Sequence, residues 1–181
     1  MFRYALVYGG ISGLIVIASV VGGMLLGDAD TDWSVLEWLG YLIMLVALSL
    51  IFVGVRRYRD EVGNGAISYW QALAVGLSIS AVAGVIYVAV WEVYLFQTDY
   101  TFINDYSDGL IAREMASGAS PEALAEFTRQ VEADKDRYGN PLFRLGITFL
   151  EIFPVGLLIS LISAAFLRRA PQAGPAASTT V

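Results

Sequence analysis

The stretch PLFRLGITFLEIFPVGLLISLISAAFLRR, residues 141–169, decides the fold class. Within it, residues 142–167 carry only two charged side chains, Arg144 and Glu151. A helix needs roughly 20 mostly apolar residues to cross about 30 Å of hydrocarbon. The stretch therefore predicts a transmembrane helix. Arg144, Glu151 and Pro154 are unusual within such a helix, because charges are costly in lipid and proline interrupts helical hydrogen bonding.

The composition of the whole chain agrees with a membrane protein. Of the 181 residues, 57% are hydrophobic and 15% are charged, whereas soluble domains average about 45–50% and about 25%. The chain has neither Cys nor His, which excludes disulfides, thiolate nucleophiles, Cys-based zinc sites and His-based triads. A net charge of −6 argues against a nucleic-acid partner. We therefore expect no enzymatic activity, no metal and no cofactor.

Three further segments are long and apolar enough to cross a bilayer. We expect the four spans at residues 4–26, 35–55, 69–96 and 142–167. The first is interpreted as a span and not as a signal peptide, because no small-residue cleavage site follows it. The predicted fold is an all-α integral membrane protein whose transmembrane domain covers residues 1–169.

Two of these helices begin with a recognisable cap. The sequences SVLE (Ser34 and Glu37) and SYWQ (Ser68 and Gln71) fit the capping box, in which each side chain bonds the backbone amide of the other residue. They open the second and third spans. An Asn-Gly pair within RRYRDEVGNGAI predicts a turn between those spans.

The basic residues predict the orientation in the membrane. Six arginines near the span ends fall on the same side when the four spans alternate: Arg3, Arg56, Arg57, Arg59, Arg168 and Arg169. Because Lys and Arg accumulate on the cytoplasmic side, both termini are predicted to be cytoplasmic. The expected location is the cytoplasmic membrane of a bacterium.

Residues 97–141, between the third and fourth spans, have a different character. They contain nine acids and four bases and are predicted to form an extracytoplasmic hairpin of two helices. Ser120 as N-cap and Pro121 at the first position open the second helix. Its apolar stripe consists of Leu124, Phe127, Val131 and Tyr138. Two roles stay open, a solvated cap over the bundle or a docking surface for a partner or ligand.

Two polar segments outside the spans, residues 27–33 and 170–181, give no candidate functional site. In GDADTDW, Asp28, Asp30 and Asp32 have the spacing that opens an EF-hand loop. That loop also needs Gly at its sixth position and Glu at its twelfth, where this chain has Trp33 and Leu39, so no metal site is predicted. The tail at 170–181 is small, polar and expected to be disordered.

Small residues recur at helical spacing in two spans. Gly9 and Gly13 lie in the first span, and Gly76, Ser80 and Gly84 lie in the third. In lipid such stripes allow helix backbones to approach closely. Packing within the bundle and homodimerisation through one stripe both remain open.

The charged residues inside the spans are the candidate functional site. At 1.5 Å per residue, counting from the cytoplasmic ends puts Arg144 within one turn of Glu92 and Glu151 level with Tyr87. Arg144, Thr148 and Glu151 have offsets that share one helical face. Charges within spans are expensive and are usually paired or face water. These five residues form the predicted intramembrane polar cluster.

Pro154 adds a helix kink beside this cluster. It lacks an amide proton and displaces the carbonyl of Leu150, which leaves a free acceptor near Glu151. In a structural interpretation, Glu92 and Arg144 form an ion pair and Glu151 is a protonated or hydrogen-bonded core acid. In a functional interpretation, the acids and the freed carbonyl form a proton or cation site.

Several stretches also resemble a known family. They are YGGISGLIV, LIFVGVRRYRD with GAISYWQALAVG, YVAVWEVY and FLEIFPVGLLISLISAAFL, in this order from about Tyr8 to Leu167. Together they resemble the bacterial membrane-protein family called domain of unknown function 4199. The Trp-Glu and Glu-Ile-Phe-Pro elements of that family match residues 91–92 and 151–154. The resemblance implies a multi-pass bacterial membrane protein and no particular activity.

The sequence thus leads to two functional hypotheses. The first is a non-enzymatic structural or accessory component of the envelope, embedded in the lipid bilayer. Its partner would be a second copy of the chain or another envelope protein, bound through residues 97–141. The alternative is a small proton- or cation-coupled transport element that uses the intramembrane carboxylates.

Overall fold

The computed structural model describes the backbone of residues 1–26 and 33–170 and the side chains of residues 1–24 and 38–170. The elements are α1 (Phe2–Tyr4), the π-helical turn η1 (Ala5–Gly9), α2 (Gly10–Leu26), α3 (Trp33–Leu48), α4 (Leu50–Glu61), α5 (Tyr69–Gln97), α6 (Phe102–Ala116), α7 (Pro121–Tyr138) and α8 (Pro141–Leu167). Throughout this described part the fold is helical, and its one β-bridge joins Ile67 to Arg169. The acidic turn at 28–32, the Ser34 and Glu37 side chains and the tail at 171–181 lie outside the described residues.

Four helices are long and apolar enough to cross a membrane, as the sequence predicts. They run over Phe2–Met24, Trp38–Glu61, Tyr69–Gln97 and Pro141–Leu167. The second continues beyond the expected end at residue 55, because the arginines and acids of α4 pair with one another along the helix. A break separates α3 from α4 at Ser49, whose hydroxyl donates to the Val46 carbonyl at 2.6 Å.

The chain divides into two compact units. The first comprises Met1–Tyr87 and Ile152–Val181, and the second comprises Val88–Glu151. Both boundaries fall inside long helices, since α5 and α8 each contribute to both units.

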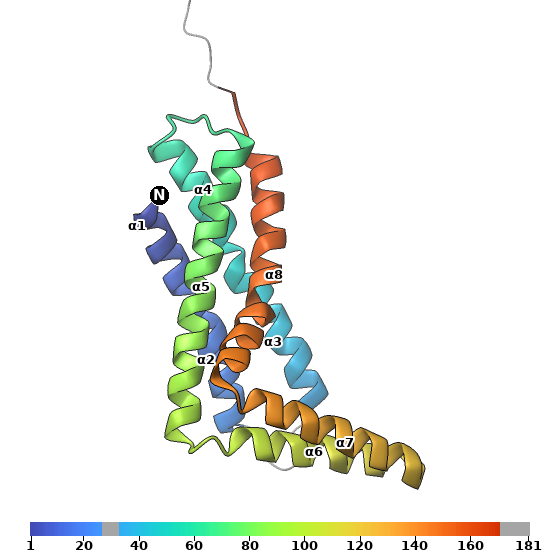
Figure 1. Ribbon diagram of the computed structural model, residues 1–181. Coiled ribbons are helices and arrows are strands. Elements are labelled where there is room, and N and C mark those ends of the chain that lie inside the picture. The colour runs from blue at the N-terminus through green and yellow to red at the C-terminus, as the bar shows by residue number, and fades with distance from the viewer. Residues whose placement is uncertain (27–32, 171–181) are drawn as a thin grey trace, which may run out of the picture. The chain divides into compact units, whose positions relative to one another are not determined.

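In the first unit, α2 packs against α5 through the glycine stripe of the first span (Figure 1). A Cβ atom on Gly9 would lie 2.5 Å from the Ile79 carbonyl oxygen, and one on Gly13 would lie 2.6 Å from that of Ala83. Real Cβ atoms do not come this close to backbone, so these positions require glycine. The stripe is used for packing within the chain.

The small residues of α5 face α8 in the same unit. A Cβ atom on Gly76 would lie 2.8 Å from the Ser160 side chain, and one on Gly156 would overlap the Ser80 hydroxyl. Gly84 is buried as well. Small residues on both helices therefore bring the backbones of α5 and α8 together, the arrangement by which helices associate in lipid.

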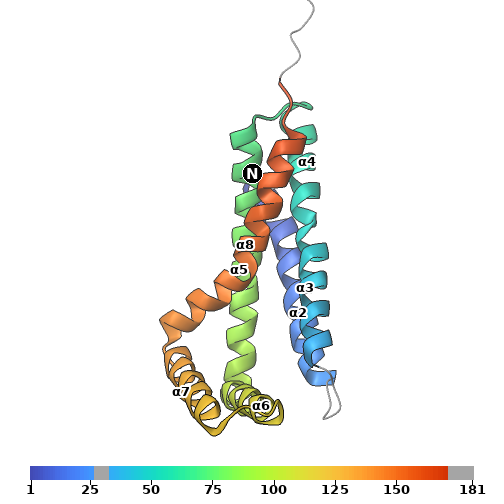
Figure 2. The same ribbon diagram turned by 90° about the vertical axis from the view of Figure 1, so that its right-hand side faces the viewer.

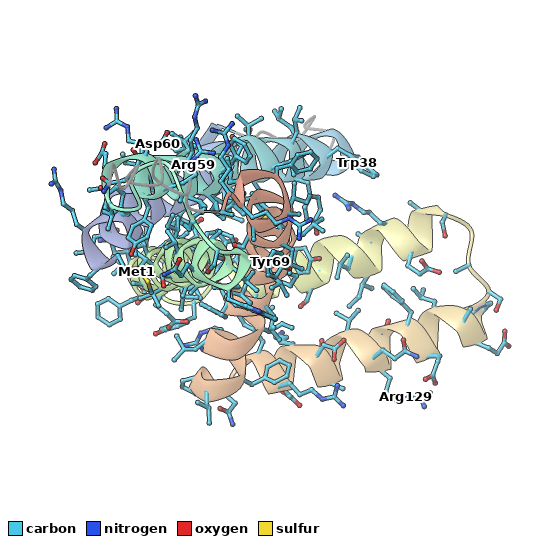
Figure 3. All side chains as sticks on the ribbon, turned by 90° about the horizontal axis from the view of Figure 1, so that it is seen from above. Met1, Trp38, Arg59, Asp60, Tyr69 and Arg129 are labelled. Carbon is cyan, nitrogen blue, oxygen red and sulfur yellow. The ribbon has the colours of Figure 1, made fainter. Side chains whose placement is uncertain are left out.

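In the first unit, α1, the end of α4 and the end of α8 lie toward the same end (Figure 1), and these segments carry Arg3, Arg56, Arg57, Arg59, Arg168 and Arg169 in or beside them. The Tyr4 hydroxyl donates to Glu61 at 2.6 Å, and the Tyr4 ring meets the Tyr58 ring edge-on at 5.4 Å. The Ile67–Arg169 bridge brings the end of α8 to the turn before α5. Figure 3, seen from above, shows Arg59 and Asp60 at this end, where they form an ion pair at 2.7 Å.

The start of α5 has the predicted cap. The Ser68 amide donates to Gln71 Oε1 at 3.2 Å, and the Gln71 amide donates to Ser68 Oγ at 3.3 Å. Before it, Asn64 and Gly65 have φ angles of 48° and 83°, as the Asn-Gly turn requires. Both predictions are confirmed.

In the second unit, α6 and α7 lie side by side and antiparallel (Figures 1 and 2). Gly118, with φ +82°, ends α6. The Ser120 hydroxyl accepts from the Ala123 amide at 3.2 Å, and Pro121 opens α7. Figure 3 shows Arg129 on the side of α7 that faces away from α6, and Val131 is buried. The predicted two-helix insert is therefore present as a hairpin.

Candidate functional site

The core of the second unit is an ion pair between the end of α5 and the start of α8. Arg144 Nε donates to Glu92 Oε1 at 2.7 Å, and Nη2 donates to Oε2 at 2.8 Å. The Arg144 side chain is 6% exposed and that of Glu92 is 24% exposed. A bidentate guanidinium–carboxylate pair of this kind is planar and fixes the relative orientation of its two helices.

The last residue of α7 completes this network. Arg144 Nη1 donates to the Tyr138 carbonyl at 3.2 Å, so the guanidinium also anchors the end of the hairpin. The guanidinium carbon lies 5.0 Å from the centre of the Tyr100 ring and 5.8 Å from that of the Tyr138 ring, within the range of cation–π attraction. Asn140 caps α8 by accepting from the Leu142 amide at 2.9 Å.

An aromatic cluster connects the same helices on another side. Trp91 Nε1 donates to the Tyr138 hydroxyl at 2.8 Å, and the Trp91 ring meets Phe102 of α6 edge-on at 5.0 Å. Phe102 in turn stacks on Tyr106 at 5.7 Å. Trp91 thus contacts residues of both α6 and α7, and it stands next to Glu92 in the chain.

The environment of Tyr138 changes its acidity. Burial raises the pKa of the Tyr138 phenol above its ordinary value, since the phenolate loses solvation. The Trp91 N–H and the Thr148 hydroxyl act in the opposite direction. Thr148 is 1% exposed. Its hydroxyl lies near the phenol of Tyr138, but the distances and angles of the described residues give this hydroxyl no hydrogen bond.

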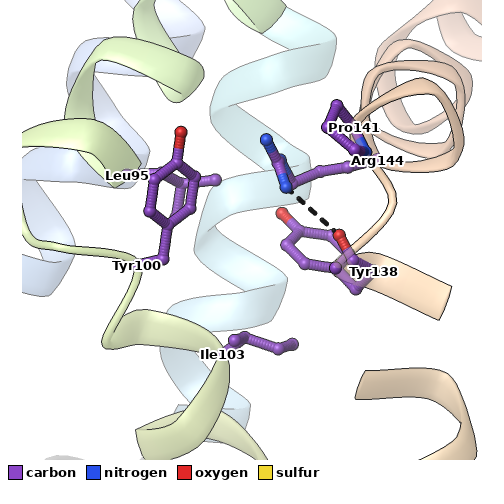
Figure 4. Close-up of a pocket in the computed structure, with 7 residues that line it drawn as sticks. Leu95, Tyr100, Ile103, Tyr138, Pro141 and Arg144 are labelled. Atoms are coloured by element: carbon purple, nitrogen blue, oxygen red, sulfur yellow. Dashed lines mark hydrogen bonds between the residues drawn. The ribbon is translucent and has the colours of Figure 1, made fainter. Parts of the chain in front are cut away.

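A cleft of about 350 Å³ opens beside Arg144 (Figure 4). It is lined by Leu95, Tyr100, Ile103, Tyr138, Gly139, Pro141 and Arg144. Figure 4 shows Arg144 reaching between the Tyr100 and Tyr138 rings, with Ile103 further along the wall. All seven residues belong to the second unit. Apart from the guanidinium and the two phenols, the lining is apolar.

Four residues of the predicted polar cluster belong to the second unit, and Tyr87 belongs to the first. Glu92 and Arg144 are paired, and Thr148 is buried one turn further along α8. Tyr87 is buried at 5% exposure in the first unit. Glu151 is exposed, which contradicts the core placement in the structural interpretation, and the interpretation as a proton or cation site stays a hypothesis.

Pro154 lies inside α8, which is helical on both sides of it. It is exposed, as is Glu151. The predicted kink itself stays a prediction. No group of three or more acidic residues that could hold a metal ion occurs among the described residues.

Sequence reasoning missed the contributions of Tyr100 and Tyr138. Tyr138 was assigned to the apolar stripe of its helix, although it lies only six residues before Arg144 in the chain. That separation was the available signal, since a residue so near the start of a span must lie near its first buried charge. Nothing in the sequence pointed to Tyr100.

These features define a class: a multi-pass helical membrane protein with four candidate spans and a helical hairpin between the third and the fourth. Over residues 7–169 the chain matches a family described as Protein of unknown function (DUF4199), and it belongs to that family. Comparison with curated proteins and with solved structures gives no significant match.

Proposed function

We propose that the protein is a non-enzymatic accessory component of a bacterial cytoplasmic membrane that presents the α6–α7 hairpin outside the cytoplasm to another envelope protein. The observation that carries this proposal is the network around Arg144. One guanidinium holds Glu92 of α5 and the Tyr138 carbonyl of α7, and Trp91 contacts α6 and α7. Two transmembrane helices and both hairpin helices are thereby fixed in one unit, as a rigid platform requires.

The surface of the hairpin supports binding of a partner protein. Two ion pairs on α7 join neighbours on the same helix, Arg129 with Glu126 at 2.9 Å and Arg137 with Asp134 at 3.2 Å. Exposed pairs of this kind contribute little to stability, about 0–1 kcal/mol. With nine acids against four bases over residues 97–141, the hairpin presents a net negative surface that would suit a basic patch on a partner.

The proposed orientation rests on the distribution of arginine. In the first unit, the N-terminal helix, the end of α4 and the end of α8 lie at one end of the unit. Arg3, the arginines of α4 and the pair Arg168–Arg169 are all close to these points in the chain. A single basic end is what the positive-inside rule expects on the cytoplasmic side.

The alternative is a proton- or cation-coupled transport element. Glu92 suits it poorly, because its two oxygens are held by Arg144. Glu151 is the other candidate, because it lies on α8 within a candidate span, where a carboxylate is expensive. Under this alternative, Glu151→Gln should abolish a proton or cation flux in proteoliposomes and leave the fold intact. The accessory role predicts no such flux in either protein.

Site-specific photocrosslinking in intact cells tests the accessory role. A photoreactive residue at Arg129, on the outer side of α7, should crosslink to one other envelope protein. The same residue at Val131, which is buried, is the matched control and should crosslink only within the chain. If Arg129 captures no protein and the purified chain is a monomer, the accessory role is contradicted.

A further inference from the structure

The cleft beside Arg144 lies where two candidate spans meet the hairpin. Leu95 belongs to the last turn of α5, and Pro141 is the first residue of α8. Both helices are long and apolar enough to cross a membrane, so these ends belong at the level of the lipid headgroups. A cleft at this level is open to the polar part of a phospholipid.

Arg144 retains donors that the protein does not use. Of the five N–H groups of a guanidinium, two bond Glu92 and one bonds the Tyr138 carbonyl. One N–H on each terminal nitrogen is left without a partner among the described residues. Arginine is the side chain best suited to hold a phosphate through two parallel N–H groups, and Arg144 lines the cleft.

The backbone at Tyr100 gives a second, independent observation. Asp99 and Tyr100 have φ angles of 50° and 57°, the left-handed region that bulky residues seldom adopt. Strained residues of this kind concentrate at ligand sites. Here the strain holds the Tyr100 ring over the guanidinium at the wall of the cleft, where the residue remains 40% exposed.

Charge and size identify the ligand. Glu92 already neutralises the Arg144 guanidinium, so the cleft attracts a phosphate by hydrogen bonds more than by net charge. Free inorganic phosphate carries more negative charge than a phosphodiester, so the Glu92 carboxylate would repel it more strongly, and it would leave the apolar walls at Leu95 and Ile103 uncovered. About 350 Å³ is at the lower end for a small-molecule site and fits a headgroup with its glycerol, but not two acyl chains.

We propose that this cleft binds the headgroup of a membrane phospholipid, with its phosphate on the two remaining N–H groups of Arg144 and its glycerol between the Tyr100 ring and the apolar wall. The acyl chains stay in the bilayer. Because the guanidinium is already neutralised, zwitterionic and anionic phospholipids bind with similar affinity. None of the residues that line the cleft is the Arg129 position proposed to meet a partner, so lipid binding does not require a partner protein.

The test uses the full chain, purified in detergent and stripped of lipid. Dihexanoyl phosphatidylglycerol is titrated in and its binding is followed by native mass spectrometry. Gly139→Leu adds a bulky side chain at the wall of the cleft. The backbone there is right-handed helical (φ −59°, ψ −23°), and a Cβ atom would lie 3.2 Å from the Asp136 carbonyl oxygen, which a small backbone shift accommodates. Gly109→Leu is the matched control, because a Cβ atom there meets nothing within 4 Å.

We expect saturable binding of one lipid per chain, a loss of affinity of roughly ten-fold or more in Gly139→Leu, and none in Gly109→Leu. Dihexanoylglycerol, which lacks the phosphate, should bind at least about ten-fold more weakly. If Gly139→Leu fails to fold, Tyr100→Gly decides, since glycine accepts the left-handed backbone and removes the ring. Three results would each overturn the proposal. A folded cleft variant could bind the lipid as tightly as the wild type, or dihexanoylglycerol could bind as tightly as the phospholipid. Equimolar inorganic phosphate could also displace the lipid.

Discussion

Replacing Arg144 by Met should destabilise the second unit strongly. The substitution keeps an unbranched side chain of similar length but leaves the Glu92 carboxylate without the two charge-assisted hydrogen bonds at 2.7 and 2.8 Å. Breaking a buried ion pair on one side costs about 3–5 kcal/mol. Glu92 retains 24% exposure, so water offsets part of this loss and we expect about 3 kcal/mol.

Thermal unfolding in detergent, followed by circular dichroism, measures this loss. For a chain of 181 residues, about 3 kcal/mol corresponds to a decrease in Tm of roughly 6–12 °C. The double variant Glu92→Gln with Arg144→Met removes both charges and should recover more than half of the decrease, because no uncompensated carboxylate remains. If Arg144→Met unfolds within about 1 °C of the wild type, or if the double variant is no better than the single one, the ion pair does not hold this unit together.

Three further variants test other parts of the structure. Gly9→Leu should destabilise the first unit by roughly 2–3 kcal/mol, because its Cβ atom would lie 2.5 Å from the Ile79 carbonyl oxygen. Gly22→Leu is the control and should leave the Tm unchanged, because a Cβ atom there meets nothing within 4 Å. Equal Tm values for the two variants would contradict this packing. Ser68→Ala should cost about 1 kcal/mol through loss of the cap on α5, and an unchanged Tm would show that the cap is dispensable. Ultraviolet titration of the wild type minus that of Tyr138→Phe should give a midpoint above the ordinary tyrosine pKa of 10.0, because burial raises the pKa of this phenol. The stability that the neutral phenol contributes is present below pH 10.0 and is lost as the pH rises through the folded pKa. A midpoint at or below 10.0 would contradict the burial of Tyr138.

The sequence predicted the helices and one half of the site well. Hydropathy and length located four spans, because a bilayer imposes its thickness on any helix that crosses it. The same regular rise per residue allowed the depths of Glu92 and Arg144 to be compared, and the structure pairs them. Caps at Ser68 and Ser120 were predictable because capping depends only on residues within one turn.

Glu151 shows where helical periodicity misleads. The buried residues of α8 follow a four-residue spacing through Thr148, Ile152 and Gly156. Four residues turn about 400° around the helix axis, so each residue of this series lies about 40° further around the helix than the one before it. Glu151 precedes Ile152 by one residue and therefore points about 100° away from it, onto the exposed surface. Glu151 does lie on the same side of the helix as Arg144, but by that depth the buried side of α8 has turned away from it.

The position of Tyr100 could not be predicted from the sequence for a different reason. It depends on how the hairpin leaves α5, through a turn in which Asp99 and Tyr100 adopt left-handed backbone conformations. Asp99 tolerates a left-handed backbone, but Tyr100 is not a residue that favours one, so the local sequence carried only a weak signal of the turn. The interactions that hold the hairpin are therefore tertiary.

The proposed accessory role requires the hairpin to lie outside the cytoplasm, and cysteine accessibility measures on which side of the membrane it lies. The chain contains no Cys, so single substitutions can be labelled without background. Gly109→Cys lies on α6 of the hairpin, and Asn64→Cys is exposed in the turn at the basic end. A membrane-impermeant maleimide applied to intact spheroplasts should label Gly109→Cys at once and Asn64→Cys only after the membrane is permeabilised. Labelling of Asn64→Cys in intact spheroplasts, with Gly109→Cys protected, would contradict the proposed orientation and the role built on it.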